Sequence, residues 1–329
     1  MSARIEKTIS RLQQRIEEGQ YYEAHQQLRV VASRYNKQQS YNAAIDILFS
    51  GAQSLLKAGQ GGSGGDICSF LVEVYKNAEL KPDSSSKGKL LTLLRLFDAE
   101  EPSRKRFIQE IISWSMVYGE YPAGDPELHH VAGSLHADEH EPYEAERHLV
   151  LGTRDSAEKL AGLEYQWYSE DESHTAPLYA ARAVLPHLLT GNVRDASRSL
   201  QLFTSRLCEE NKSLGVQDVS SASSDLRIYP SLPLLNFLGL LLLAIQRGSA
   251  DLFKSLKSHY APHLRDVESW EEPLEQIGEM YFGIQMRRQT NPLFDMMGSL
   301  FGGGGGGGGT KQPKPRRVEA PAPAAPDLD

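Results

Sequence analysis

The sequence has little cysteine and no apolar run long enough to cross a membrane. Its two cysteines, Cys68 and Cys208, are too few for a disulfide scaffold or a four-cysteine zinc site, so a reducing compartment is expected. The longest apolar run, Leu234–Ile245, falls short of the ~20 residues that a transmembrane helix needs. No apolar signal segment follows Met1. The sequence therefore predicts a soluble protein.

Regular alternation of apolar and polar residues, which is typical of β-strands, is also scarce. Up to about Phe301, apolar residues instead recur at intervals of three and four, as they do over Ile5–Ile16, and this spacing indicates amphipathic helices. Gly19 can end the first helix, and a second, antiparallel helix is expected over residues 20–35. The run Leu234–Ile245 is expected to be a central core helix or one that a second chain covers.

A weak repeat links several helices. It consists of an aromatic or branched residue, a small residue two or three positions later, and a leucine four positions after that. The instances are Tyr22, Ala24 and Leu28; Tyr41, Ala44 and Leu48; Tyr143, Ala145 and Leu149; Val193, Ala196 and Leu200; and, in degenerate form, Ser249, Leu252 and Leu256. Small residues let helices approach closely, and each helical pair leaves an apolar face for the next pair to cover. We therefore predict an all-α fold, a right-handed α-solenoid of TPR-like helical pairs.

Breaks in the helical pattern indicate loops, one hairpin and a tail. Stretches rich in glycine, proline or serine at residues 59–66, 81–88 and 121–127 are expected to be loops that join helices. Between residues 211 and 230 branched and aromatic residues flank a serine-rich turn, which predicts a β-hairpin near residues 214–229. Eight consecutive glycines and a proline-rich segment follow Phe301, so residues 302–329 are expected to form a disordered tail.

One string fits an enzyme motif, because His136, Glu139 and His140 match the H-x-x-E-H pattern of zinc peptidases. A zinc site would need both histidines on one stable helix, but Pro142 favours an inter-helix turn here, so solvated loop histidines are expected. A zinc hydrolase built on these three residues remains the enzymatic alternative. The G-x-G-x-x-G match at residues 59–64 follows a predicted helix instead of a strand, which favours a flexible loop over a nucleotide site. No enzymatic activity, cofactor or metal is therefore expected.

Basic residues are concentrated near the N-terminus. Residues 1–40 hold seven basic and four acidic side chains, whereas the whole chain has a net charge of -8, which opposes nucleic-acid binding. A basic stripe consists of Arg4, Lys7, Arg11 and Arg15 on the first helix and continues with Tyr22, Gln26 and Arg29 on the second. The stripe indicates either a docking face for an acidic partner or a solvated outer face of a terminal helix.

Apolar surface is expected in the C-terminal half. Pro292–Phe301 is a short segment rich in methionine, an adaptable side chain that suits contact with another chain. The predicted hairpin would offer edge strands to the same chain. Binding of a partner and packing of the segment on its own chain both remain open.

Six blocks of sequence, in a fixed order, carry a resemblance to a known family. They are EEGQYYEAHQQLR (Glu17–Arg29), SYNAAIDILFSGAQSLLKAGQGGSGGD (Ser40–Asp66), GEYPAGDPELH (Gly119–His129), YEAERHLVLGTRDS (Tyr143–Ser156), LNFLGLLLLAIQ (Leu235–Gln246) and QTNPLFDMMGSLFGG (Gln289–Gly303). With these blocks the chain resembles the Golgi-to-ER traffic protein four family, the helical adaptor of the pathway that delivers tail-anchored membrane proteins to the endoplasmic reticulum. The likeness extends over nearly the whole chain to Gly303.

The resemblance implies a cytosolic, non-enzymatic adaptor with two partners. Residues 1–150 would dock and regulate the targeting ATPase of the pathway, and residues 151–301 would hold a ubiquitin-like-domain subunit and, through it, a TPR co-chaperone. The ATPase contacts are expected at Arg11, Arg15, Tyr22, Arg29 and, as the regulatory acidic contact, Asp66. The contacts to the partner subunit are expected at Val216, Leu226, Ile228, Tyr229, Phe237, Leu241, Phe294 and Met297. A generic helical-repeat scaffold of another complex is the remaining alternative.

Overall fold

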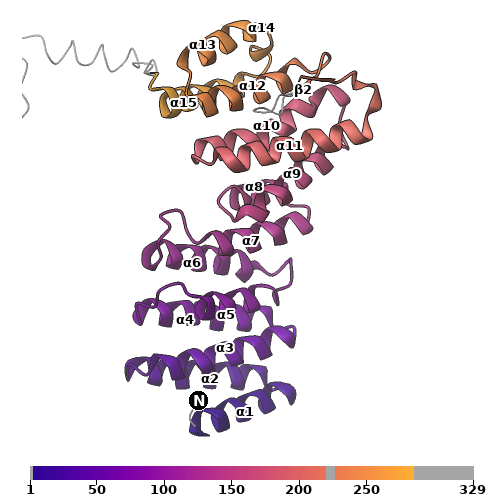
Figure 1. Ribbon diagram of the computed structural model, residues 1–329. Coiled ribbons are helices and arrows are strands. Elements are labelled where there is room, and N and C mark those ends of the chain that lie inside the picture. Colours follow the sequence, from indigo (N-terminus) through magenta and orange to yellow (C-terminus); the bar gives the residue numbers. More distant parts are fainter. Residues whose placement is uncertain (1–2, 220–226, 285–329) are drawn as a thin grey trace, which may run out of the picture. The chain divides into compact units, whose positions relative to one another are not determined.

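The computed structural model describes residues 3–219 and 227–284, which lie in one compact unit that spans residues 1–286 (Figure 1). The helices of the first half are α1 (Ala3–Glu17), α2 (Tyr21–Lys37), α3 (Tyr41–Lys57), α4 (Gly61–Asn77), α5 (Ser84–Leu94), α6 (Pro102–Tyr118), α7 (Pro126–Asp138) and α8 (Pro142–Leu149). Each helix packs against one or more of its neighbours in the chain, so that successive helices form a stack.

The second half continues the stack and adds a short hairpin. Its helices are α9 (Arg154–Tyr168), α10 (Ala176–Leu189), α11 (Val193–Glu210), α12 (Pro233–Arg247), α13 (Ala250–His259), α14 (Ala261–Leu264) and α15 (Glu271–Phe282). The described residues also include the short 3-10 turns η1 (Ser173–Thr175), η2 (Lys212–Leu214) and η3 (Glu268–Trp270). Strands β1 (Gln217–Asp218) and β2 (Arg227–Ile228) are antiparallel, with Gln217 opposite Ile228. The prediction of an all-α, solenoid-like fold with one inserted hairpin is confirmed.

The first helices end with the same turn at intervals of 20 residues. Gly19, Gln39, Gly59 and Glu79 each follow a helix with a positive φ, between 48° and 79°. At Gly19 the backbone N–H bonds to the Ile16 carbonyl, and the next N–H bonds to the carbonyl of the residue five positions before it. Such pairs of bonds satisfy carbonyl groups that a helix end leaves without partners, and they reverse the chain in a fixed way. The turn therefore sets the regular stacking of α1 to α4.

The small and leucine positions of the weak repeat form the contacts between helices. Ala24, Leu28, Ala44 and Leu48 are completely buried, and so are their equivalents Ala145 and Leu149 in α8. The aromatic position has no such fixed role, because Tyr22 and Tyr143 are among the most exposed apolar side chains of the described residues. Burial of the alanine and the leucine stabilises the pairing of helices, whereas the ring of Tyr22 is left largely exposed.

The glycine-rich stretch is not the flexible loop expected from the sequence. Only Gly59 and Gln60 form a turn, and residues 61–66 are the first turns of α4. A Cβ atom on Gly64 would lie 2.6 Å from Cδ2 of Leu56, so a side chain at this position would collide with α3. The glycines are therefore needed for close helix packing, a use that composition alone does not distinguish from a loop. The expected loop at residues 81–88 is likewise shorter, because α5 begins at Ser84 behind the cap residue Asp83.

Of the two alternatives for Leu234–Ile245, the structure supports the core helix, because Leu235, Phe237, Leu238 and Leu241 of α12 are buried within this chain. No helix of the described part of the chain is long and apolar enough to span a membrane. The predicted tail, residues 302–329, and the methionine-rich segment at Pro292–Phe301 lie outside the described residues. The functional division near residue 150 stays a prediction.

Substitution of Gly64 by alanine should lower the free energy of unfolding by about 1–2 kcal/mol, because the added methyl group collides with Leu56 in a packed interface. Gly62→Ala, two positions earlier in α4, is the matched control, since nothing lies within 4 Å of its Cβ position. That variant should be neutral or more stable by about 0.5–1 kcal/mol through helix propensity. Urea unfolding followed by circular dichroism measures both, and equal effects of the two substitutions would contradict the packing role of Gly64.

Candidate protein-binding surfaces

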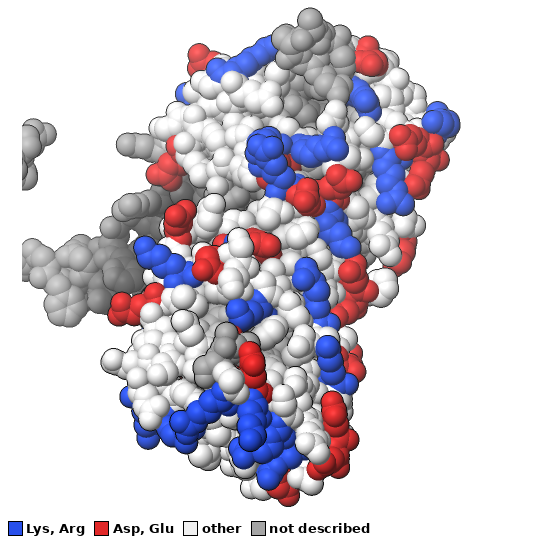
Figure 2. Space-filling view, turned by 60° about the horizontal axis from the view of Figure 1, so that its bottom comes forward, with Lys and Arg blue, Asp and Glu red and all other residues white. Residues whose placement is uncertain are grey.

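Helix α1 carries its basic residues on the side that faces away from the core. Leu12 and Ile16 are buried against the following helices, whereas Arg11 is exposed and Arg15 is half-buried. Figure 2 shows lysine and arginine side chains gathered at the end of the molecule where α1 lies. A positively charged end of this kind attracts an acidic partner over a distance of about 10 Å at moderate ionic strength.

Helix α2 adds large exposed side chains to this end. Tyr22 is 70% exposed and Val30 is 68% exposed, and Gln26 and Arg29 lie between them on the same side of the helix. Exposed tyrosine and arginine side chains contribute much of the binding energy in protein interfaces. The sequence does not indicate that Val30 is exposed, because valine side chains are usually buried.

The structure brings two of the predicted ATPase-binding residues into direct contact. The Arg29 guanidinium donates a hydrogen bond to Oδ2 of Asp66, although the two residues are 37 positions apart and lie on α2 and α4. His25 Nε2 lies 2.8 Å from the same carboxylate oxygen. Burial by itself would raise the pKa of Asp66, but the hydrogen bonds and positive charge of Arg29 and His25 outweigh it and lower that pKa. His25 is a member of this group that sequence reasoning missed.

Two open hollows flank Arg29. One has a volume of about 310 Å³ and is lined by Asp66, Phe70 and Arg106, among other residues. The other has a volume of about 710 Å³ and lies along α2, where Val30 and Lys37 line it. The Arg29 side chain borders both hollows, and its guanidinium carbon lies 5.8 Å from the centre of the Phe70 ring. The surface around Arg29 therefore has room for side chains of a partner.

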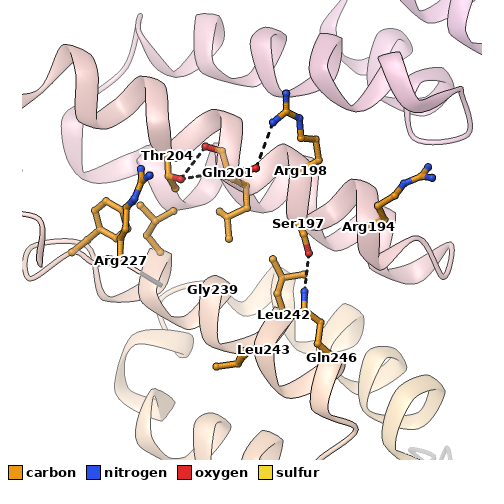
Figure 3. Close-up of a pocket in the computed structure, with 13 residues that line it drawn as sticks. Arg194, Ser197, Arg198, Gln201, Thr204, Arg227, Gly239, Leu242, Leu243 and Gln246 are labelled. Carbon is orange, nitrogen blue, oxygen red and sulfur yellow. Dashed lines mark hydrogen bonds between the residues drawn. The ribbon is translucent and has the colours of Figure 1, made fainter. Parts of the chain in front are cut away.

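A third hollow lies between α11 and α12 in the C-terminal half and has a volume of about 390 Å³ (Figure 3). Its apolar lining comes from Leu200 of α11 and from Leu235, Leu242 and Leu243 of α12. Its basic lining residues are Arg194, Arg198 and Arg227, the last from strand β2. An apolar floor with polar groups around it is the usual composition of a groove that binds a segment of another protein. We call this hollow the α11–α12 groove.

The predicted partner-subunit residues occupy different environments around this groove. Tyr229 lines the groove and is mostly buried, and Val216 and Ile228 are half-buried next to it in the hairpin region. Phe237 and Leu241 are completely buried in the core, so they support α12 from behind. The other three predicted residues, Leu226, Phe294 and Met297, lie outside the described residues.

The residues of the groove that sequence reasoning missed are mainly those of α11, together with Leu242 and Leu243. Helix α12 is apolar on all sides, so its sequence does not indicate which side remains open. Successive residues of a helix are about 100° apart, so Leu243 points away from the side on which Leu241 is buried. The spacing of apolar and polar residues along α11 indicates a helix with one buried side and one solvent-facing side. It does not indicate that α12 lies opposite α11 in the fold.

The H-x-x-E-H string does not converge on one site. His136 lies in the last turn of α7 and is buried, so the expectation of solvated loop histidines is wrong for this residue. Pro142 restricts only Glu141 before it, which leaves α7 free to continue to Asp138. His140 is exposed and has a positive φ of 59° in the turn that follows. The expected inter-helix turn is therefore confirmed for Glu139 and His140.

Within the described residues, His136, Glu139 and Glu141 place possible metal-ligating atoms within 4.8 Å of one another. Each carboxylate already has a partner. Both oxygens of Glu139 accept hydrogen bonds of 2.7 Å from the buried guanidinium of Arg104, and Glu141 lies 2.7 Å from Nδ1 of His136. These contacts join α6 to the turn after α7, so the cluster has a structural explanation that does not involve His140.

A second pair of histidines packs beside His136 between α7 and α8. His129 Nε2 lies 3.0 Å from the Ala123 carbonyl, which can only accept, so this nitrogen carries a hydrogen. In the neutral ring Nδ1 of His129 then accepts from Nδ1 of His148, 2.9 Å away. Burial, together with the charges of His129 and His136, lowers the pKa of His148 to about 4. Burial also lowers the pKa of His129, so His129 and His148 are neutral near pH 7 and act as core side chains.

Comparisons with known proteins agree on one family. The sequence matches the model of the family described as Golgi to ER traffic protein 4 over residues 38–301. Golgi to ER traffic protein 4 of Aspergillus fumigatus is 56% identical over the full length of both chains. The protein of that name from Schizosaccharomyces pombe is 34% identical and covers 92% of this chain and 96% of its own. A crystal structure of Get4 from C. therm. is 56% identical, has a TM-score of 0.86 and covers 97% of this chain and 100% of its own.

Substitution of His140 by glycine should raise the free energy of unfolding by about 1 kcal/mol, because a side chain in the left-handed conformation is strained and glycine is not. Asp138→Gly, in the last turn of α7, is the matched control and should lower it by about 0.5 kcal/mol, because glycine has a lower helix propensity than aspartate and the exposed ion pair with Lys159 is lost. Chemical unfolding measures both effects. A loss of stability in His140→Gly, accompanied by loss of bound zinc in elemental analysis, would instead support the zinc site.

Proposed function

This chain belongs to the Golgi to ER traffic protein 4 family, and we propose that it is a non-enzymatic adaptor in the insertion of tail-anchored proteins into the endoplasmic reticulum membrane. Its N-terminal half, residues 1–150, docks the targeting ATPase and regulates it. Its C-terminal half, residues 151–301, holds the ubiquitin-like-domain subunit and, through it, the TPR co-chaperone. It works in the cytosol by binding alone, without a cofactor.

The observation that carries this proposal is the presence of two unlike surfaces that share no residue. The first, on α1 and α2, is basic and carries the exposed side chains Tyr22 and Arg29. The second, the α11–α12 groove, has an apolar floor of leucines. An adaptor that holds two proteins at once needs two separate surfaces, whereas a single catalytic centre would need its reactive groups in one place.

The two surfaces suit two kinds of binding. Exposed charges increase the association rate and make binding sensitive to salt, which suits an ATPase that must dock and leave. Burial of leucine side chains in a groove gives slow dissociation that salt changes little, which suits a permanent subunit. We infer that Arg11, Arg15, Tyr22, Arg29 and Asp66 act in the first contact and that the α11–α12 groove and the hairpin act in the second.

Reversal of charge at Arg11 and Arg15 should remove the ATPase from the complex and leave the ubiquitin-like subunit bound. The double variant Arg11→Glu plus Arg15→Glu is expected to weaken ATPase binding more than tenfold at low salt, because two attractive charges become repulsive. The matched control is Arg147→Glu plus Arg154→Glu, which makes the same change of charge at exposed positions of α8 and α9. Pull-down from source cytosol with mass spectrometry, repeated over a range of salt concentrations, measures the effect. If the wild-type protein recovers neither partner, the adaptor function is wrong and a scaffold of another complex takes its place.

A charged side chain in the α11–α12 groove should remove the ubiquitin-like subunit from the complex and leave the ATPase bound. Leu243 is half-buried in the groove lining, so Leu243→Asp is expected to reduce binding of the ubiquitin-like subunit more than tenfold because a carboxylate would be desolvated there. ATPase docking should not change. Leu243→Met keeps the groove apolar and serves as the control, and thermal unfolding verifies that both variants fold. Normal recovery of the subunit with Leu243→Asp would exclude the groove as its binding site.

A further inference from the structure

The contact between Arg29 and Asp66 has a consequence for how the proposed ATPase contact forms. Both residues are predicted to touch the ATPase, yet in this chain they bind each other. Arg29 cannot at the same time neutralise Asp66 and bind an acidic group of a partner with the same donor atoms. The side chains are 47% and 38% exposed, so both can be reached from solvent. Ion pairs as exposed as this one are weak and can be exchanged for others.

The surroundings of Arg29 allow this exchange. The guanidinium lies over the Phe70 ring, on the border between the hollow that contains Asp66 and the hollow along α2. A change of rotamer would carry the guanidinium of Arg29 from the first hollow into the second, which lies along α2. The backbone would not have to move. His25 would stay next to Asp66, since its side chain is only 15% exposed and comes from the preceding turn of α2.

We propose that Arg29 and Asp66 form a latch, in which Arg29 neutralises the charge of Asp66 in the unbound protein and releases it only when an acidic group of the docking ATPase draws Arg29 away. The proposal rests on the function proposed above and concerns the regulation of the same surface. Once Arg29 has left, Asp66 keeps only the imidazole of His25 as a partner, and its negative charge is open to a basic group of the ATPase. Docking through Arg29 therefore precedes the regulatory contact through Asp66.

The latch predicts a specific change in association kinetics. Removal of the charge in Asp66→Asn releases Arg29 before the ATPase arrives, so the association rate constant should rise two- to fivefold. In a chain that already carries Arg29→Gln, the same Asp66→Asn substitution should have no effect, because no latch remains to be opened. Stopped-flow measurement of ATPase binding with the wild type, both single variants and the double variant gives the four rate constants.

A control separates the latch from the general effect of charge. Asp138→Asn removes one negative charge from another exposed ion pair between helices, the pair with Lys159, and should leave the association rate unchanged. An equal rise with Asp66→Asn in both Arg29 backgrounds, or an unchanged or slower rate with Asp66→Asn in the wild-type background, would overturn the latch.

A measurement on the free protein distinguishes failure of the latch from failure of the proposed function. The pKa of Asp66, followed by carbon NMR of its carboxyl group, should rise when Arg29→Gln removes the guanidinium. An unchanged pKa would overturn the latch whatever the ATPase does. If the pKa rises but the wild-type chain does not bind the ATPase, the intramolecular contact is real and its proposed role in docking is wrong.

Discussion

The position of the functional surfaces depends on how each helix of the N-terminal stack ends. Helices α2, α3 and α4 begin at residues 21, 41 and 61 and have 17 residues each, and the same left-handed turn separates them. Because every turn reverses the chain in the same way, helices two steps apart in the chain lie in equivalent orientations. This regularity places α2 and α4 in contact and brings Arg29 within hydrogen-bonding distance of Asp66.

The repeated turn would not produce a stack without small residues at the helix contacts. Ala24 and Ala44 are completely buried, and at Gly64 even a methyl group would collide with the preceding helix. Close contact buries apolar surface on every helix, so the outward-facing side chains are not needed for helix packing. Large or charged side chains such as Tyr22 and Arg11 can then occupy those positions at little cost to the fold. The packing of the stack and the composition of its binding surfaces are thus nearly independent.

Two expectations from the sequence were wrong for one reason, which is that local composition was interpreted without tertiary contacts. The glycines of residues 61–65 predict a loop from composition alone, but they lie in helix α4. Glycine is favoured at Gly64 because a side chain there would collide with α3. The proline after His140 predicts that His136 is solvated, but His136 is buried. Glu141 and the stacked ring of His148 stabilise it there. The deciding contact of Gly64 comes from α3, and those of His136 come from the turn after α7 and from α8.

The sequence by itself determined the all-α class, the helices α1 and α2 with their break at Gly19, the hairpin and the basic character of α1. These features follow from spacing, capping and charge, which act over a few residues and can be read locally. Only the tertiary structure decided that Arg29 meets Asp66 and His25, and that Leu243 lines a groove while Phe237 is buried. Such contacts depend on the angle and distance between helices that are distant in the chain, and these follow from the packing of the whole stack.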